Sequence, residues 1–353
     1  MRCSRAGLSR QQDILPCGTI EPHRDFLCPV WERELSCYQI ELMSQNRKKS
    51  RVAALSVVSN SILVVFKLIV GLLSGAVSIL SEAIHSGVDL VAALIAFFAV
   101  RASGKPADDK HSFGHGKFEN LSAAIEGLLI FLAAGWIIYE SIHKLIFPEP
   151  VDNLQWGIIV MGISAITNLF ISRKLFKVGK ETDSAALLAD GWHLRTDVWT
   201  SAGVAVGLAL YMIGRQVMPE LNLHWIDPVI AMGVAGLIIK AAWELTSEAV
   251  TYLLDASLPE DEDKAIKLII DQMSPQVMNF HNFKTRKAGS ERFVEFHLVV
   301  KQDLTVKQAH DICDVITEKI KIQFPKTEVM IHTEPCLSEC NGDCRGTCSI
   351  FEA

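Results

Sequence analysis

Six long hydrophobic stretches, separated by short polar segments, fill the middle of the chain. They lie at about residues 52–73, 78–100, 120–146, 154–176, 185–213 and 225–254, and their apolar residues run together instead of recurring at amphipathic spacing. A hydrocarbon core about 30 Å thick is crossed by roughly 20 apolar residues in a helix. The pattern therefore predicts an α-helical polytopic membrane protein with six transmembrane helices, in a domain of residues 51–255.

The pattern changes after the sixth stretch. A helical period in "LPEDEDKAIKLIIDQM" is followed by alternation in "ERFVEFHLVV", by a second helical period in "TVKQAHDICDVITEKIKIQF" and by a strand pattern in "TEVMIHTE". The segment "NFKTRKAG" is a further strand candidate. This order predicts a small C-terminal α+β domain of residues 256–335.

Composition agrees with a membrane protein whose partner is the lipid bilayer, since 50% of the 353 residues are hydrophobic and 21% are charged. The distribution of basic residues is more informative about orientation in the membrane than the net charge of −6. They cluster on one side of the predicted helices: Arg47, Lys48, Lys49 and Arg51; Arg101, Lys105, Lys110 and Lys117; Arg173, Lys174, Lys177 and Lys180. The other loops carry at most one Lys or Arg each, so the positive-inside rule predicts cytosolic termini. No nucleic-acid partner is expected.

Residues 1–50 are predicted to be a cytosolic segment. Residues 1–42 have neither the apolar core of a signal peptide nor a helical period, whereas Met43 opens the basic segment "MSQNRKKSR". Two interpretations stay open: the natural chain starts at Met43, or residues 1–42 are a genuine disordered extension. The mass of the untagged protein's N-terminal peptide distinguishes them.

Ionisable side chains inside two predicted membrane helices form the first candidate site. His85 and Asp89 are four residues apart in "SEAIHSGVDL", so they share one helix face. The same spacing recurs in "DGWHLRTDVWTS" with His193 and Asp197. Two imidazoles and two carboxylates suit four-coordinate Zn²⁺, and the carboxylates would neutralise the ion. A helix-packing hydrogen bond explains one such pair, but two identical pairs favour a metal site.

Longer motifs resemble a known family. The segments "GLLSGAVSILSEAIHSGVDL", "KPADDKHSFGHGKFENL", "DGWHLRTDVWTS" and "IHTEP" are similar to those of zinc-type cation diffusion facilitators, over residues 50–335. The resemblance implies a homodimer of six-helix protomers with a metallochaperone-like cytosolic domain, exchanging cytosolic metal for protons. It also implies a transport site formed by His85, Asp89, His193 and Asp197.

Two details refine the resemblance. His85 stands where iron and broad-range exporters carry Asp, which places the chain nearer the zinc-selective pattern, because imidazole nitrogen suits Zn²⁺ better than harder ions. A long His-rich loop between the fourth and fifth stretches, found in many vesicular relatives, does not occur in the sequence. This favours a bacterial inner membrane.

The loop "ADDKHSFGHGKFE" holds a second candidate set. Asp108, His111 and His115 match the loop metal site of bacterial relatives. The alternative is a solvated loop shaped by Gly114 and Gly116.

The resemblance also implies a charge pair between Lys117 and Asp255, expected between protomers. Lys117 could instead extend to a lipid phosphate.

The C-terminal domain holds a third set, in which the resemblance implies regulatory or structural metal binding. Its members are His281, His297, His310, His332 and Glu334. The family's usual ending is His-x-Asp-Pro, whereas this chain has "HTEP", so the longer side chain of Glu334 need not reach the same distance.

Residues 336–353 form a Cys-rich tail, with Cys336, Cys340, Cys344 and Cys348 at every fourth position. Structural disulfides are rare in a reducing compartment. Soft-metal binding and a disordered tail therefore remain the two alternatives.

The predicted function is a transporter that exports Zn²⁺ from the cytosol in exchange for protons. Fe²⁺, Co²⁺, Cd²⁺ and Mn²⁺ stay open as cargo, Zn²⁺ is also the expected regulatory ligand, and no organic cofactor is expected. The alternative is a membrane-anchored metal sensor or scaffold without turnover. A hydrolytic enzyme is disfavoured, because the sequence shows no nucleophile–base pair and no nucleotide-binding loop.

Overall fold

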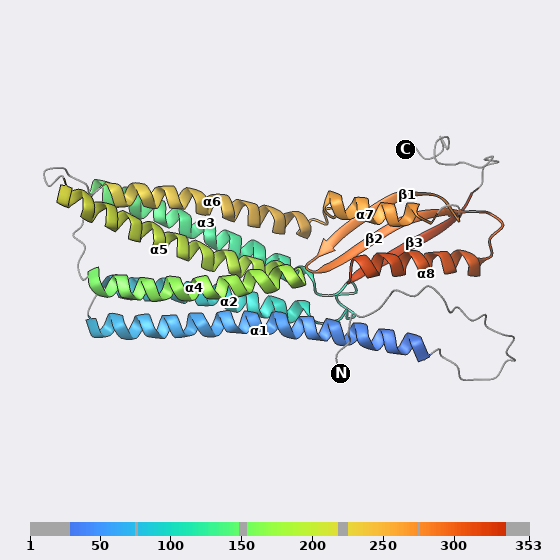
Figure 1. Ribbon diagram of the computed structural model, residues 1–353, viewed down its shortest axis with the longest axis horizontal. Coiled ribbons are helices and arrows are strands. Elements are labelled where there is room, and N and C mark those ends of the chain that lie inside the picture. The colour runs from blue at the N-terminus through green and yellow to red at the C-terminus, as the bar shows by residue number, and fades with distance from the viewer. Residues whose placement is uncertain (1–28, 75–76, 148–153, 218–224, 274–275, 337–353) are drawn as a thin grey trace. The chain divides into compact units, whose positions relative to one another are not determined.

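The computed structural model describes residues 29–74, 77–147, 154–217, 225–273 and 276–336 (Figure 1). It divides the chain into two units, Met1–Lys48 and Lys49–Ala353. The described part of the first unit is the beginning of helix α1. The contacts between the membrane helices and the C-terminal domain lie within the second unit.

Long helices make up most of the described residues between 29 and 253. They are α1 (Pro29–Ser74), α2 (Val77–Ser103), α3 (Lys117–Ile146), α4 (Leu154–Thr182), α5 (Ala185–Val217) and α6 (Ile226–Leu253). Within the described residues, five segments are long and apolar enough to cross a membrane: Met43–Leu73, Ala83–Ser103, Lys117–Ile146, Ile159–Thr182 and Pro228–Leu253. Helix α5, the fifth predicted span, has 33 residues. These helices confirm the predicted polytopic membrane fold.

The N-terminal boundary of α1 corrects one expectation. Residues 29–42, in which no helical period was expected, belong to α1. Pro29 is the first helical residue, a position where its missing N–H removes no hydrogen bond. Glu, Leu and Gln are frequent in "WERELSCYQIEL", and these strong helix formers favour a helix without an amphipathic period.

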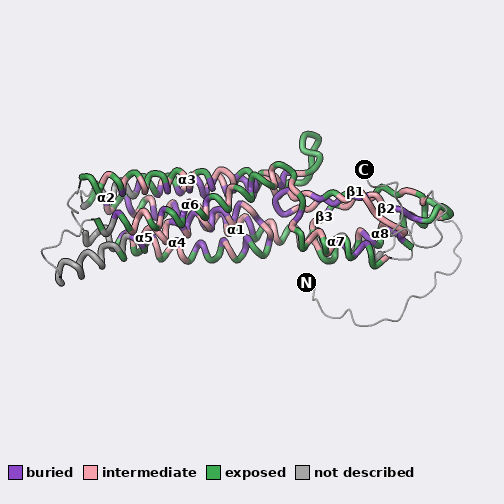
Figure 2. The backbone as a smooth tube through the Cα atoms, turned by 90° about the horizontal axis from the view of Figure 1, so that it is seen from above, coloured by how far each residue is buried: buried purple, intermediate pink, exposed green. Residues whose placement is uncertain are grey.

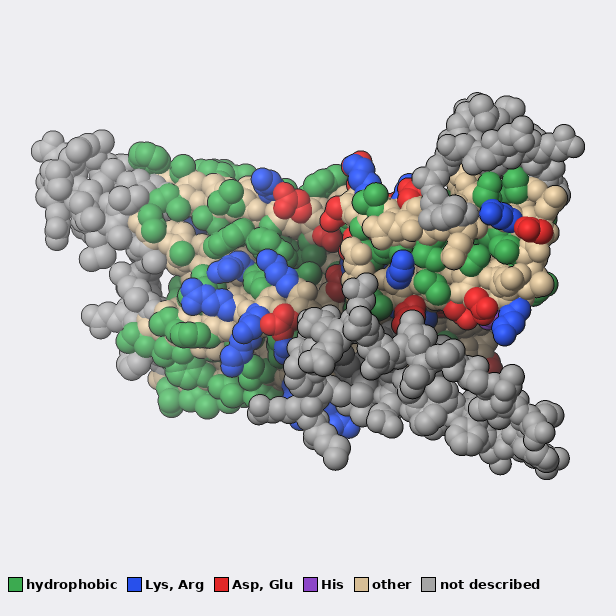
Figure 3. All heavy atoms as spheres, turned by 45° about the vertical axis from the view of Figure 1, so that its right-hand side comes forward, with side chains coloured by type: hydrophobic (Ala, Val, Ile, Leu, Met, Phe, Trp, Pro, Cys, Tyr) green, Lys and Arg blue, Asp and Glu red, His purple; other side chains and the backbone are tan. Residues whose placement is uncertain are grey.

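Small residues bring the membrane helices close together. A Cβ added at Gly127 of α3 would lie 2.1 Å from Oγ1 of Thr246 on α6. Ala123, Ala189 and Ala249 form a buried cluster of α3, α5 and α6. Close approach at small residues is the usual basis of helix packing in membranes. Buried positions recur along α3 at helical spacing (Figure 2), and hydrophobic side chains cover the outside of the helices on the face shown in Figure 3.

The C-terminal domain consists of α7 (Glu260–Asp271), β1 (Val277–Ala288), β2 (Glu291–Val300), α8 (Val306–Gln323) and β3 (Thr327–Pro335). The sheet order is β1-β2-β3, with β1 antiparallel and β3 parallel to β2. The parallel pair is connected through α8, as a parallel connection requires. A capping box at Thr305 and Gln308 starts α8. The predicted α+β domain is therefore confirmed, with "NFKTRKAG" inside β1.

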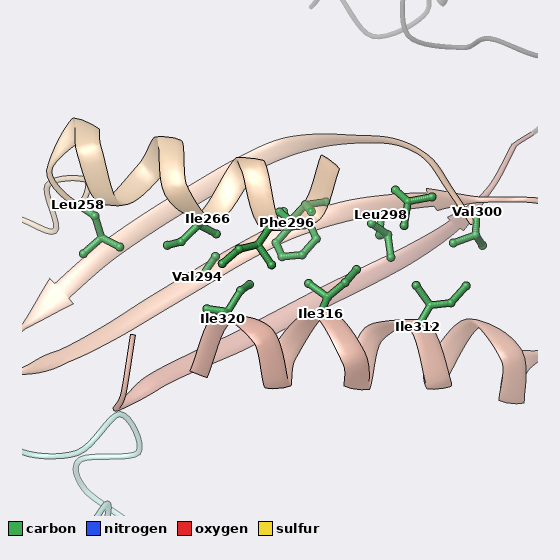
Figure 4. Close-up of a cluster of buried hydrophobic side chains, with 12 residues drawn as sticks. Leu258, Ile266, Val294, Phe296, Leu298, Val300, Ile312, Ile316 and Ile320 are labelled. Atoms are coloured by element: carbon green, nitrogen blue, oxygen red, sulfur yellow. The ribbon is translucent and has the colours of Figure 1, made fainter. Parts of the chain in front are cut away.

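Both helices of this domain cover the same face of the sheet. Alternate residues of β2, from Val294 to Val300, pack with Ile266 and Ile270 of α7 and with Ile312, Ile316 and Ile320 of α8 (Figure 4). The intervening residues of β2 therefore point to the opposite face. That face carries His297.

A buried ion pair links the membrane helices to the C-terminal domain. Nζ of Lys49 lies 2.9 Å from Oε1 of Glu119 and 3.1 Å from Oγ of Ser290, in the turn between β1 and β2. The carboxylate of Glu119 also accepts hydrogen bonds from Ser103 and Ser184. Lys49 is 2% exposed and Glu119 is fully buried. The pair thus connects α1, α3 and the β1–β2 turn.

Backbone contact reinforces this junction. Gly289, with a φ of 59°, donates its backbone N–H to Oδ1 of Asn120 on α3 over 2.6 Å. A Cβ at Gly289 would lie 2.6 Å from the carbonyl oxygen of Gly116. Only glycine fits both the conformation and the close approach.

Candidate functional site

Helices α2 and α5 bring the intramembrane candidate residues together. Nε2 of His193 lies 3.1 Å from Oδ1 of Asp89, and Nε2 of His85 lies 4.0 Å from the same oxygen. His85, Asp89 and Asp197 each offer one ligand atom within 4.8 Å of the others. Asp89 and His193 are buried, whereas the side chain of His85 is about half exposed. Nitrogen and oxygen donors thus converge from two helices, with two carboxylates to balance a divalent charge.

Asn168 of α4 supports this cluster from outside it. Its Nδ2 donates to Oδ2 of Asp197 over 3.2 Å, and the residue is buried. A fixed carboxylate keeps its other oxygen directed toward a ligand, as outer-shell partners of metal ligands do. Sequence reasoning missed Asn168, because its position relative to Asp197 depends on the packing of α4 against α5.

The loop between α2 and α3 gathers Asp108, His111 and His115. Oδ1 of Asp108 lies 3.2 Å from Nδ1 of His111, and Oδ2 lies 3.3 Å from Nε2 of His115. Nδ1 of His115 lies 3.2 Å from the carbonyl oxygen of Pro106. A carbonyl only accepts, so Nδ1 is the nitrogen that can donate to Pro106, and Nε2, which faces Asp108, is the nitrogen that a metal would use.

The same loop also contains a turn that depends on glycine, as expected if it is a solvated loop shaped by Gly114 and Gly116. Gly114 has a φ of 78°, and its backbone N–H donates to the carbonyl oxygen of His111 over 2.9 Å. Backbone hydrogen bonds from His111 and Lys110 lower the pKa of Asp108 below its usual value. The carboxylate is therefore ionised and held in place before any ion binds.

Lys117 and Asp255 form the expected ion pair, but within one chain. Nζ of Lys117 lies 2.9 Å from Oδ1 of Asp255, and it also donates to the carbonyl oxygen of Leu253 over 3.2 Å. The hydrogen bond from Lys117 lowers the pKa of Asp255. The expectation that this pair joins two protomers stays a prediction. Asp255, with a φ of 58°, lies two residues after the end of α6, and α6 packs along α3, which starts at Lys117.

Three histidines of the C-terminal domain lie side by side on one level of the sheet. His281 of β1 pairs with His297 of β2, and His297 pairs with His332 of β3. Glu334, two residues after His332, points to the same face. Its carboxylate oxygens lie 2.8 Å from Nδ1 of His297, 3.4 Å from Nε2 of His281 and 3.6 Å from Nε2 of His332. The longer side chain of Glu334 therefore reaches the centre of the cluster.

His310 is not part of this cluster. It lies on α8, which covers the opposite face of the sheet, and its side chain is 73% exposed beside Asp314. The amphipathic pattern of α8 directs Ile312 and Ile316 toward the sheet and His310 away from it. The expectation that His310 joins the set is wrong for this structure.

The cysteine tail lies almost wholly outside the described residues. Cys336 is described, and its backbone N–H donates to the carbonyl oxygen of Val300 over 2.8 Å, which extends the pairing of β3 with β2. Cys340, Cys344 and Cys348 are outside the described part of the chain.

Two further buried carboxyl groups escaped the sequence analysis. Glu126 of α3 is fully buried, and Asp190 of α5 is 1% exposed. A signal was present, because Glu126 interrupts a predicted membrane helix and Asp190 precedes His193 by one helical turn. An ionisable residue inside a membrane helix is by default a candidate functional residue.

Comparisons with known proteins agree with this architecture. The pattern of the cation efflux transmembrane domain matches residues 53–254, and that of the cation efflux protein cytoplasmic domain matches residues 258–336. The uncharacterized transporter sll1263 of Synechocystis sp. is 37% identical over 263 residues, 74% of this chain and 83% of its own length. The cation-efflux pump FieF of Cronobacter sakazakii is 34% identical over 290 residues, 82% of this chain and 94% of its own length.

Among solved structures, the Zn form of CzrB is 36% identical and covers 22% of this chain and 90% of its own, with a TM-score of 0.22. The metal-bound C-terminal domain of the CzcD transporter from Thermotoga maritima is 27% identical and covers 23% of this chain and 93% of its own, with a TM-score of 0.21. The two matched patterns together extend from the first membrane helix to the end of β3. This multi-pass membrane protein therefore belongs to the cation diffusion facilitator family of cation efflux transporters.

Proposed function

We propose that this protein exports Zn²⁺ from the cytosol in exchange for protons, and that His85, Asp89, His193 and Asp197 hold the ion during transport. The observation that carries the proposal is the convergence of their nitrogen and oxygen donors within the membrane helices. Two carboxylates offset the charge of a divalent ion there, which reduces the cost of burying it.

The donor set supports Zn²⁺ as the preferred cargo. Two imidazoles and two carboxylates suit tetrahedral Zn²⁺, whereas Mn²⁺ prefers oxygen ligands. Fe²⁺, Co²⁺ and Cd²⁺ are weaker candidates on the same grounds. Relatives such as FieF are known as cation-efflux pumps, a name that specifies no single metal.

Proton exchange follows from the chemistry of the same side chains. Imidazole titrates near neutral pH, and a protonated imidazole cannot bind a metal ion. The contact of 3.1 Å between His193 and Asp89 is one that an imidazolium and a carboxylate would make after the ion has left. Protons arriving from the outer side would thus compete with the metal and favour its release.

The remaining metal sites are assigned to roles outside the transport path. We assign Asp108, His111 and His115 to ion binding in the cytosolic loop, and His281, His297, His332 and Glu334 to a regulatory metal site. The supporting observation is the central position of the Glu334 carboxylate among three histidines. We assign the protein to a bacterial inner membrane, with both termini in the cytosol. We also propose that the active form is a homodimer.

A metal sensor without turnover is the second candidate. The clusters in the loop and in the C-terminal domain would serve a sensor equally well. The cluster on α2 and α5 supports the transporter, because ligands inside the membrane suit an ion that crosses it.

Metal uptake into proteoliposomes under an imposed pH difference tests the proposal. Uptake of Zn²⁺, Fe²⁺, Co²⁺, Cd²⁺ and Mn²⁺ is compared for the native chain, for Asp197→Ala and for Glu244→Ala, an exposed acidic residue of α6 as the matched control. We expect Zn²⁺ uptake by the native chain and the control, and none by Asp197→Ala. Metal binding without uptake in the native chain would favour the sensor.

A further inference from the structure

Glu126 and Asp190 form a second acidic site inside the membrane helices. Oε1 of Glu126 accepts a hydrogen bond of 3.1 Å from Ser122. Within the described part of the protein, Oε2 of Glu126 and both carboxylate oxygens of Asp190 accept no hydrogen bond. The hydroxyl of Ser56 faces Asp190, but the two groups do not have the geometry of a hydrogen bond. Three buried carboxyl oxygens thus lack a donor.

A carboxylate anion in these surroundings would be strongly disfavoured. Burial without donors penalises the charged form far more than the neutral acid. The titratable groups that face the pair are His193 on α5 and Asp89 on α2, while α1 contributes the neutral Ser56. Thr246 faces α3 from α6 beside Gly127. Glu126 and Asp190 are close enough to interact electrostatically, so ionising one disfavours ionising the other.

The pair is better suited to protons than to metal. The described residues contain three groups of three converging metal-ligand atoms: one in the loop, one in the C-terminal domain, and one at His85, Asp89 and Asp197. Glu126 belongs to none of these groups. A neutral carboxylic acid needs no cation beside it, and two acids that interact electrostatically bind their protons as a coupled pair.

We propose that Glu126 and Asp190 form a proton-binding site next to the transport site, and that this site binds and releases a proton in step with the metal ion. This inference rests on the proposed exchange of Zn²⁺ for protons. It assigns part of that exchange to residues that are not metal ligands.

His193 is the physical connection between the two sites. It faces Asp89 with Nε2, and both Glu126 and Asp190 lie within electrostatic range of its ring. A divalent ion bound at His193 adds positive charge next to the acidic pair and favours loss of its proton. Departure of the ion reverses the effect, so occupancy by metal and by proton alternates.

The position of the pair also fits the proposed direction of exchange. Asp190 lies one turn before His193, toward the start of α5, and Glu126 lies in the first third of α3. With cytosolic termini, both helices start on the cytosolic side. A proton released from the pair has a shorter path to the cytosol than one released from His193.

The test measures the Zn²⁺ gradient that the native full-length protein maintains at steady state. Proteoliposomes are held at a pH difference of one unit with the membrane potential clamped at zero. Each exchanged proton then contributes about a tenfold ratio of Zn²⁺ concentrations, because one pH unit and a tenfold ratio are the same free energy. Glu126→Gln removes the proton site with little change in size. Glu140→Gln, an exposed residue of the same helix, is the matched control.

We expect Glu126→Gln to lower the steady-state ratio by about tenfold relative to the native chain and the control, with Zn²⁺ binding unchanged. A ratio equal to that of the native chain overturns the inference. If the native chain itself maintains no gradient in response to pH, the proposed exchange is wrong and the inference falls with it. The two failures are therefore distinguishable.

A second measurement avoids substitution. Infrared difference spectra of the native protein, with and without Zn²⁺ at neutral pH, should show the carbonyl band of a protonated carboxyl group that is lost when the ion binds. The absence of this band overturns the inference even if Glu126→Gln does not fold.

Discussion

Replacing Lys49 should destabilise the protein strongly, because its partner is completely buried. The ammonium group lies 2.9 Å from Oε1 of Glu119, and the two residues are 2% and 0% exposed. Removing one member of a buried ion pair costs about 3–5 kcal/mol, since the other charge stays in the interior. Hydroxyl donors from Ser103 and Ser184 remain on Glu119. We therefore expect Lys49→Met to lower the free energy of unfolding by about 3 kcal/mol, the lower end of that range.

The double substitution Lys49→Met with Glu119→Met separates a lost ion pair from lost packing. It removes both charges and leaves only two hydroxyl groups without their acceptor, at a cost of about 1 kcal/mol each. We expect it to be about 1 kcal/mol more stable than Lys49→Met alone. Lys240→Met is the control, because Lys240 is 75% exposed and lies 3.9 Å from Glu244. An exposed pair at that distance contributes little.

The assay is reversible unfolding in mixed micelles with increasing denaturing detergent, followed by tryptophan fluorescence. If Lys49→Met unfolds at the same detergent fraction as the native protein, the buried ion pair does not stabilise the junction. If the double variant is no more stable than the single variant, the loss does not come from the uncompensated carboxylate. Either result would show that the buried charge of Glu119 does not account for the stability of this junction.

Three further outcomes are expected. His85→Asp should keep Zn²⁺ uptake and widen acceptance toward Cd²⁺, because an oxygen ligand replaces imidazole; an unchanged ratio of Zn²⁺ to Cd²⁺ uptake would contradict this. A chain truncated after Pro335 should keep near-normal maximal Zn²⁺ flux, and loss of flux at saturating Zn²⁺ in a folded dimer would place the tail in the mechanism. Burial and the charge of Lys49 lower the pKa of Lys326 from 10.5 to about 8. Between these values the folded state binds fewer protons than the unfolded state, so the free energy of unfolding should rise with pH across that window. Lys326→Gln should abolish this rise in pH-dependent unfolding, and a rise that persists would assign it to another group.

Much of the fold follows from local patterns in the sequence. Uninterrupted apolar runs are sufficient to locate membrane helices, because the bilayer demands both their length and their internal hydrogen bonding. Alternation in "ERFVEFHLVV" located β2, whose inward residues became the core of the C-terminal domain. The spacing of His85 and Asp89 placed both on one face of α2, and the structure brings that face to His193.

The sequence could not show which faces of the helices and of the sheet pack against one another. His310 could be assigned to a helix, but its exclusion from the histidine cluster depends on α8 lying on the face of the sheet opposite His297. The contact of Asn168 with Asp197 and the burial of Lys49 against Glu119 join residues far apart in the chain. Glu126 is different, since a carboxyl group within a predicted membrane helix was visible in the sequence and was overlooked.

The most direct test of the proposed transport site is the Zn²⁺ flux of Asp89→Asn in proteoliposomes at saturating Zn²⁺. This substitution keeps the size of the side chain but removes one of the two charges that offset the ion, at a buried position 3.1 Å from His193. His297→Ala, in the C-terminal cluster, is measured alongside it. We expect no measurable flux for Asp89→Asn and near-normal maximal flux for His297→Ala. Substantial flux through Asp89→Asn would contradict the assignment of the transport site.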